Sequence, residues 1–231
     1  MRIFVAALAA AGCLAGAGAS EAAQLYKATF TGHIVPGGYD LANVFGLGAG
    51  FTVLEGQTVT ASFIYDPTLG NVVNLGPNAE GRRGGLIPFN NVGPIVDAFL
   101  TINNITIEFT PEQRSEIRNI SNIYQWSLQD QVAPGPGYND FAVNLNFPGS
   151  TGHLTDTRPA GAATGAGLFT IRDSQGLQRA NANFTLSEAA ITTYTPRAAV
   201  PEPASWALLI VGFGGVGAVL RQRRRSAALA A

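Results

Sequence analysis

Cysteine is almost missing from this chain of 231 residues. The single cysteine, Cys13, falls within an N-terminal segment that we expect to be removed. The remaining body then has no thiol, which excludes disulfides and thiolate-bound metals. Histidine is nearly as scarce: His33 and His153 are 120 residues apart, and neither belongs to an HExxH motif. We therefore expect no metal site, and no residue pattern indicates a cofactor.

Charge is also scarce, at 13% of residues, which is about half the usual share. Between Gln24 and Val200 there are nine basic and thirteen acidic residues, and Lys27 is the only lysine. The body therefore carries a formal charge of −4. A protein that binds nucleic acid needs clustered positive charge, so we exclude nucleic acid as a partner.

Motifs of catalysis are missing too. The chain has no G-x-S-x-G nucleophile elbow. Ser150 and His153 are close in sequence, but no acidic motif supports them, and the stretch is typical of a flexible turn. Glu108 and Glu112 are acidic enough for glycoside cleavage, yet a solvated surface is the simpler interpretation. We expect no catalytic residue and no enzyme.

Two other polar groups have competing interpretations. Asp130, Asn139 and Asp140 bracket a Pro-Gly loop and offer oxygens to calcium, but no EF-hand loop or repeat accompanies them. Arg82 and Arg83 lie in a glycine-rich stretch that we interpret as a solvated loop, with contact to an acidic polysaccharide or a phosphate as the alternative. Three glycosylation sequons, which we interpret as chance, begin at Asn104, Asn119 and Asn183.

What is present at the front is an export signal, residues 1–23. Arg2 precedes a short apolar run and then small residues, and the small-x-small pattern predicts signal peptidase cleavage between Ala19 and Ser20. A second cleavage option lies at residues 20–22. Acylation of Cys13 is an alternative, but Ala10 stands where lipoprotein signals usually have leucine, so we interpret the cysteine as incidental.

The body, residues 24–196, is dominated by apolar and polar residues that alternate with a period of two. This alternation predicts half-buried antiparallel strands. The predicted strands lie within 26–34, 57–67, 99–109, 123–129 and 139–148, with a last one around 183–186 and a further one near Ile191. We expect an all-β protein, an antiparallel β-sandwich of jelly-roll type.

The connections are predicted from turn and capping residues. Asn103 and Asn104 predict a tight hairpin turn, with a bulge as the alternative. Thr110, Pro111 and Gln113 fit the start of a short helix that runs to about Arg118. Long loops are expected at 36–50, 66–94, 133–138 and 148–165. Carboxylates or aromatics that converge in one groove would indicate a sugar-binding or polysaccharide-active protein, and the candidate aromatics are Tyr124, Trp126 and Tyr138.

The back of the chain predicts a transmembrane helix. Residues 206–220 contain no charge, and fifteen helical residues span about 22 Å, somewhat less than a bilayer core of about 30 Å. Trp206 fits the membrane interface. The positive cluster that follows predicts a stop-transfer signal with a cytoplasmic tail, residues 226–231, and consists of Arg221, Arg223, Arg224 and Arg225. Four glycines allow close helix packing: Gly212, Gly214, Gly215 and Gly217.

The segment 197–225 resembles the PEP-CTERM sorting signal in its PEPxxWA form. The resemblance rests on Pro201, Glu202 and Pro203, then Trp206 and Ala207, followed by the apolar run, the glycines and the arginines. The methionines that often follow Trp-Ala are leucines here. The resemblance covers about the last 30 residues and does not extend to the body.

The resemblance implies a route. Proteins of this kind occur in Gram-negative bacteria that make exopolysaccharide, and a membrane enzyme, exosortase, is thought to recognise the Pro-Glu-Pro region and process the tail. The expected path is export across the inner membrane, transient anchoring, and then the cell surface or extracellular matrix. The implied role is structural or adhesive. The alternatives are a polysaccharide-binding or polysaccharide-active protein on the same route, and a permanently anchored single-pass protein.

Overall fold

The computed structural model describes residues 23–120, 122–131 and 137–196. The chain divides into two units, residues 1–194 and 195–231, and only the first is described as a folded body. The expected signal peptide and transmembrane helix therefore lie outside the described residues. Within them, no helix has the length and apolar character needed to cross a membrane.

The described chain is built from antiparallel strands, as predicted. The fourteen strands are β1 (Leu25–Ile34), β2 (Tyr39–Asp40), β3 (Thr52–Val53), β4 (Thr58–Tyr65), β5 (Asn71–Val72), β6 (Ala79–Gly84), β7 (Ile95–Ile102), β8 (Ile105–Phe109), β9 (Arg114–Ile120), β10 (Ile123–Gln131), β11 (Tyr138–Asn146), β12 (Arg158–Ala162), β13 (Thr164–Arg172) and β14 (Gln178–Tyr194).

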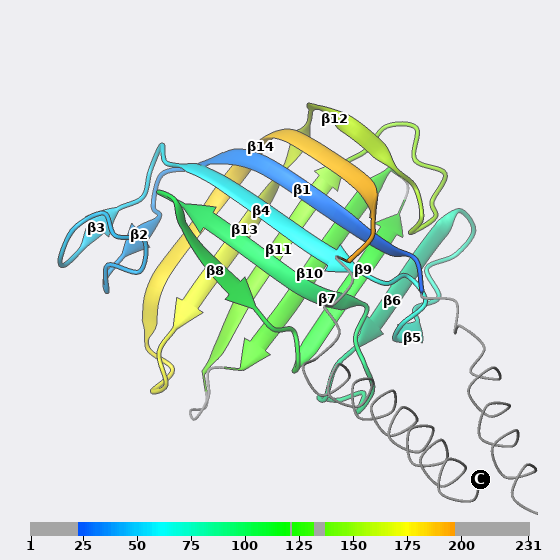
Figure 1. Cartoon of the computed structure of the whole chain (residues 1–231), viewed down its shortest axis with the longest axis horizontal. Coiled ribbons are helices and arrows are strands. Elements are labelled where there is room, and N and C mark those ends of the chain that lie inside the picture. Colours follow the sequence, from blue (N-terminus) through cyan, green and yellow to red (C-terminus); the bar gives the residue numbers. More distant parts are fainter. Residues whose placement is uncertain (1–22, 121, 132–136, 197–231) are drawn as a thin grey trace, which may run out of the picture. The chain divides into compact units, whose positions relative to one another are not determined.

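All these strands belong to one sheet, ordered β5-β6-β9-β10-β11-β13-β14-β1-β4-β7-β8, with β2, β3 and β12 attached off this path. The sheet curls over, so that β1, β4, β7 and β8 cross in front of β9, β10, β11 and β13 (Figure 1). The long β14 lies in the middle of the order and joins the two halves, because it pairs with β13 along its first part and with β1 along its second.

The core lies between the two halves of the sheet and is rich in aromatic rings. Phe63 on β4 stacks on Phe141 of β11, with ring centroids 4.6 Å apart. Trp126 on β10 meets Phe30 of β1 at 5.0 Å. All four of these rings are buried. Aromatic pairs add about 0.5–1.5 kcal/mol each beyond the area they bury, so these contacts hold the two halves together.

The alternation in the sequence predicts this arrangement because each strand presents one apolar face to the core. The predicted hairpin at Asn103 and Asn104 is confirmed: both residues have positive φ, 49° and 61°, and they join β7 to β8. Asparagine tolerates this conformation better than most residues.

The predicted helix at 110–118 is wrong. Residues 114–120 form β9, which pairs with β6 on one side and β10 on the other. Ser115, Ile117 and Asn119 face inward and are buried. The capping pattern around Thr110 was a local signal, and two ladders of backbone hydrogen bonds outweigh it. Gln113, expected to close a capping box, instead donates through Nε2 to Oε1 of Gln131 at 2.5 Å.

The predicted loops are also partly wrong. The range 36–50 contains β2, and 133–138 ends on the first residue of β11. The range 66–94 contains β5 and β6, and 148–165 contains β12 and the start of β13. The glycine-rich stretch around Arg82 and Arg83 is strand β6 and not a flexible loop. The last strand is one element of 17 residues, where the sequence predicted a strand at 183–186 and another near Ile191.

Candidate functional site

Polar side chains gather on the outer face of β10, β11 and β13. The register aligns side chains across these strands in rows. One row contains Ser127, Ala142 and Leu168, and the next contains Gln129, Asp140 and Thr170. These residues alternate with the core residues of the same strands and so point away from the core.

The two rows form a hollow of about 320 Å³, which we call the outer-face hollow. The side chains of Ser127 and Ala142 are small, whereas Gln129, Asp140 and Arg114 beside them are long or charged. The depression lies where the small side chains of Ser127 and Ala142 stand between these larger ones and Leu168. Its position on paired strands means that the donors and acceptors around it are held at fixed spacing.

Asp140 is held in place from two sides. Gln129 Nε2 donates to Asp140 Oδ1 at 2.9 Å, and Arg172 Nη1 lies 3.5 Å from Asp140 Oδ2. Asn181 Nδ2 donates to Thr170 Oγ1 at 2.8 Å. The hollow therefore presents amides, hydroxyls and the carboxylate of Asp140, whose charge is balanced by Arg172. Such a set can exchange hydrogen bonds with a ligand that carries many hydroxyls.

A cluster of ions lies beside the hollow, centred on Glu116, which is opposite Ser127. Arg83 donates to both carboxylate oxygens at 2.9 Å, Arg118 donates to Oε1, and Arg114 Nη2 is 3.5 Å from Oε2. Burial acts to raise the pKa of Glu116, but the hydrogen bonds from Arg83 and Arg118 outweigh it and the pKa is lowered. Arg83, which the sequence placed in a solvated loop, thus forms an ion pair within the body.

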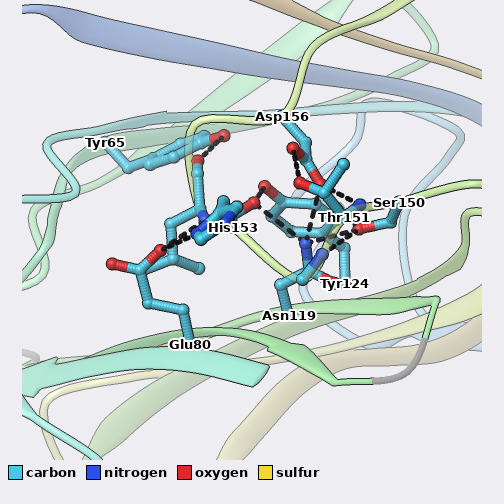
Figure 2. A network of polar contacts seen from close by, with 10 residues as sticks. Tyr65, Glu80, Asn119, Tyr124, Ser150, Thr151, His153 and Asp156 are labelled. Atoms are coloured by element: carbon cyan, nitrogen blue, oxygen red, sulfur yellow. Dashed lines mark hydrogen bonds and ion pairs between the residues drawn. The ribbon is translucent and has the colours of Figure 1, made fainter. Parts of the chain in front are cut away.

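The second polar constellation fastens the connection between β11 and β12 (Figure 2). Asp156 accepts hydrogen bonds from the Ser150 hydroxyl at 2.8 Å, from the Thr151 hydroxyl and backbone N–H at 2.6 and 2.7 Å, and from Asn119 Nδ2 at 3.3 Å. Burial acts to raise the pKa of Asp156, but these hydrogen bonds dominate and lower it. The stretch that the sequence indicated as a flexible turn is therefore tied to its own carboxylate.

Two buried tyrosines also donate hydrogen bonds to the backbone of the connection between β11 and β12. Tyr124 donates to the carbonyl oxygen of His153 at 2.5 Å, and Tyr65 donates to that of Leu154 at 3.2 Å (Figure 2). Burial raises the pKa of both phenols above the ordinary range. Together with Trp126, which is fully buried, Tyr124 belongs to the core. These two aromatics do not form a sugar-binding groove, and only Tyr138 of the three candidates is exposed.

Ser150 and His153, which were considered as a catalytic pair, have other partners in the structure. The Ser150 hydroxyl donates to Asp156 and not to His153, whose Nδ1 lies 3.6 Å from Oε2 of Glu80. His33 is exposed on β1. Glu108 and Glu112 are exposed on β8 and on the link that follows it.

The calcium candidates do not converge. Asp130 lies opposite Asn139 in the β10–β11 ladder, whereas Asp140 lies opposite Gln129, so Asp140 points to the other face of the sheet. Burial raises the pKa of Asp130. In the part of the chain that the structure describes, no three histidine, cysteine or acidic side chains are grouped for a metal ion.

The three sequons differ in their surroundings. Asn119 is fully buried, and its Nδ2 donates to Ser150 Oγ and to the His153 carbonyl at 2.6 and 2.9 Å. It cannot accept a glycan in the folded chain. Asn104 lies in the β7–β8 turn and Asn183 is exposed on β14.

Sequence reasoning missed the outer-face hollow. Alternation in β11 does place Asn144 and Asn146 on the solvent side, as the sequence indicated. The rows across three strands depend on which strands are neighbours, however, and the sequence of a single strand does not determine its neighbours.

The predicted sorting residues lie outside the described part of the chain, so comparison with known families provides the test for them. Residues 199–225 match the PEP-CTERM protein-sorting motif. The matched range includes Pro201, Glu202, Pro203, Trp206 and Ala207, and it ends at the last arginine of the cluster, Arg225. The resemblance found in the sequence is thereby confirmed.

The PEP-CTERM motif supports export of the chain and its sorting at the membrane by an exosortase-type enzyme. No curated protein and no solved structure matches the chain significantly. The match covers the C-terminal segment and not the body, so the body's role depends on its own geometry.

Proposed function

We propose that this chain is an exported protein whose PEP-CTERM segment is processed by an exosortase-type enzyme, and that its body then serves a structural or adhesive role at the cell surface or in the extracellular matrix. The observation that carries the proposal is the motif match at residues 199–225. Signal peptidase would first remove the export signal by cleavage between Ala19 and Ser20. The body itself would perform no catalysis.

The chemistry of the C-terminal segment supports transient anchoring. Two prolines around Glu202 would favour an extended segment, because proline fixes φ and disfavours helix in the residue before it. An extended segment fits an enzyme cleft. The uncharged run of residues 206–220 would hold the chain in the bilayer, and its glycines would let the helix pack closely against a membrane enzyme.

The body suits a structural role. Its curled sheet encloses an aromatic core, in the manner of a β-sandwich, and we assign it to that class with a jelly-roll-like connectivity as the finer proposal. Stability without disulfides would come from this core and from long strand pairings. Such a body tolerates the extracellular space without depending on redox conditions.

The test is the mature C-terminus. We expect the cell-associated or secreted protein from a strain with an exosortase to end near Pro203 when measured by intact-mass spectrometry. A triple variant, Pro201→Ala with Glu202→Ala and Pro203→Ala, should accumulate with its full C-terminus in the inner membrane. Gln175→Ala, on an exposed turn of the body, is the control and should be processed normally.

Two results would contradict the proposal. An intact wild-type chain that ends at Ala231 at its final location would favour a permanent single-pass anchor. Deletion of residues 201–225 without any change of compartment would remove the sorting role altogether.

A second function, binding of exopolysaccharide, is favoured by the outer-face hollow. Amides, hydroxyls and a compensated Asp140 surround it, and the rows are held at strand spacing. We expect Gln129→Ala with Thr170→Ala to reduce glycan-array binding of the exported protein about tenfold. Gln175→Ala, on the exposed turn between β13 and β14 and away from the residues that line the hollow, is the control. Equal glycan binding by the double variant and the wild type would exclude the hollow.

A further inference from the structure

Exposed apolar side chains are grouped on the connection between β6 and β7 and at the start of β7. Leu86, Ile87, Val92 and Val96 are 53%, 57%, 68% and 38% exposed. Leu86, Val92 and Val96 line a hollow of about 720 Å³ together with Leu69, Ile95 and Pro111, and Ile87 directly follows Leu86 in the chain. We call these four exposed residues the β6–β7 patch. Single exposed apolar residues are ordinary, but a group around one hollow marks an interaction surface.

The patch is held in shape by its backbone. Gly85 and Asn91 exchange two backbone hydrogen bonds, of 3.0 and 3.2 Å. Leu86 N–H donates to the Glu112 carbonyl at 2.9 Å, and Ile87 N–H donates to that of Gln113 at 3.1 Å. These bonds fasten the connection to the link between β8 and β9, so its apolar side chains stay directed outward.

The patch lies at the end of the sheet from which the chain continues toward its C-terminal segment. Tyr194, the last residue of β14, pairs with Leu25, and the next residue of β1, Tyr26, pairs with Tyr65 of β4. Tyr65 in turn pairs with Ile95, which lines the hollow. The end of β14, the start of β1, the end of β4 and the start of β7 thus share one end of the sheet (Figure 1).

The distances are short. Three strand spacings of about 4.8 Å separate β14 from β7, which is about 14 Å. Eleven residues, 195–205, connect β14 to the apolar run that begins at Trp206, and a fully extended chain of that length spans at most about 40 Å. An anchored chain therefore keeps this end of the body close to the bilayer.

The charges nearby indicate what kind of surface fits. Arg83 on β6 lies with its guanidinium 5.7 Å from the centre of the Phe89 ring, and both Arg83 and Arg114 are already paired with Glu116. The other polar residues that line the hollow are the amides Asn90 and Asn91, with Thr110 and Glu112. This composition suits the apolar and zwitterionic interface of a bilayer, whereas recognition of anionic headgroups would require basic residues.

From this geometry we propose that the β6–β7 patch docks the body onto the lipid surface while the chain is still anchored, and that processing of the tail releases it. The inference rests on the proposed anchoring. Docking would hold the extended segment around Glu202 near the membrane plane. Loss of the anchor would remove the high effective concentration that a short tether provides, and the weak contact would then dissociate.

The test uses the full chain in phosphatidylcholine vesicles, in a Cys13→Ala background that leaves no other cysteine. Ile87→Cys carries an environment-sensitive fluorophore. Leu177→Cys is the matched control: it is similarly exposed, at 53%, but it immediately precedes β14, at the opposite end of that strand from Tyr194. We expect lipids with a nitroxide on the acyl chain to quench the label at position 87 at least about threefold more than the label at position 177.

The outcomes separate the inference from the proposal on which it rests. Vesicle flotation measures anchoring. If the chain does not float with the vesicles, both the proposed anchoring and the inferred docking are refuted. A chain that floats with equal, weak quenching at the two positions overturns docking and leaves anchoring intact. Shielding of position 87 from aqueous iodide, without quenching by lipid and with a dependence on protein density, would assign the patch to a second copy of the chain. Adding Val92→Glu should lower the quenching at position 87 if lipid is the partner.

Discussion

At the scale of single residues, Asp156 shows how one carboxylate can order a whole connection. It gathers the hydroxyls and a backbone N–H of the segment that precedes it, and it also receives Asn119 from the core. The sequence marks this stretch only as a turn. Its order comes from Asp156, six residues after Ser150, and from the buried side-chain amide of Asn119 on β9.

We predict that Asp156→Ala lowers the free energy of unfolding by on the order of 2 kcal/mol, because several hydrogen bonds to a charged group are lost. The folded pKa of Asp156 lies below its unfolded value of about 3.9, so its contribution is present above that pH and is lost as the pH falls through the folded pKa. Denaturant unfolding between pH 7 and pH 3 measures this. A difference between wild type and variant that grows on acidification would contradict the assignment.

The phenols of Tyr65 and Tyr124 give the opposite pH dependence. Burial raises both pKa values, so the stability they contribute is present below the unfolded value of about 10 and is lost as the pH rises above it. We predict that the folded chain, which has six tyrosines, ionises fewer than six at alkaline pH, and that the rest ionise on unfolding. Ultraviolet absorbance of tyrosinate counts them. With Tyr65→Phe, the late group should shrink by one; six early tyrosinates in the wild type would refute the burial.

At the scale of elements, strand pairing decides what local sequence does not. The strands with strict alternation, such as β1 and β11, are predictable because one face is apolar throughout. β6 is not, because Gly81 and Gly84 resemble a loop, and β9 is not, because its start resembles a capped helix. Both become strands through neighbours far away in the sequence. The candidate site shares this property, since its rows need β10, β11 and β13 to lie together.

Glycine in β13 offers a test of this packing. A Cβ added to Gly167 would lie 2.1 Å from Cζ of Phe184, its partner on β14. We predict that Gly167→Ala destabilises the chain by about 1–3 kcal/mol, because the buried ring must move. Gly161→Ala on β12 is the matched control, since nothing lies within 4 Å of its added Cβ, and it should change stability little. Thermal melting of the two variants compares them, and equal melting temperatures would exclude the close contact.

At the scale of the whole molecule, the chain combines a body with a polar outside and a C-terminal segment that determines its destination. The motif of that segment could be identified from sequence alone because its residues are consecutive. The body could be assigned a class but not a strand order, because its sheet closes over an aromatic core drawn from both halves of the chain.

The core provides a reporter for the whole fold. Trp126 is buried against Tyr124, with ring centroids 4.9 Å apart, and also meets Phe30. In a Trp206→Phe chain it is the only tryptophan. We predict a blue-shifted emission that moves to longer wavelength in one step on denaturation, coincident with the loss of the far-ultraviolet circular dichroism signal. Separate transitions for the two signals would mean that the two halves of the sheet unfold independently.

The length of β14 has a mechanical consequence. The strand pairs with β1, β13, β12 and β2, and its last residue leads directly to the C-terminal segment. A force applied along this strand would load its backbone hydrogen bonds in shear, so that they would have to break together rather than one after another. While the chain is anchored, the body would therefore resist a pull along β14 better than a pull that peels the strand away.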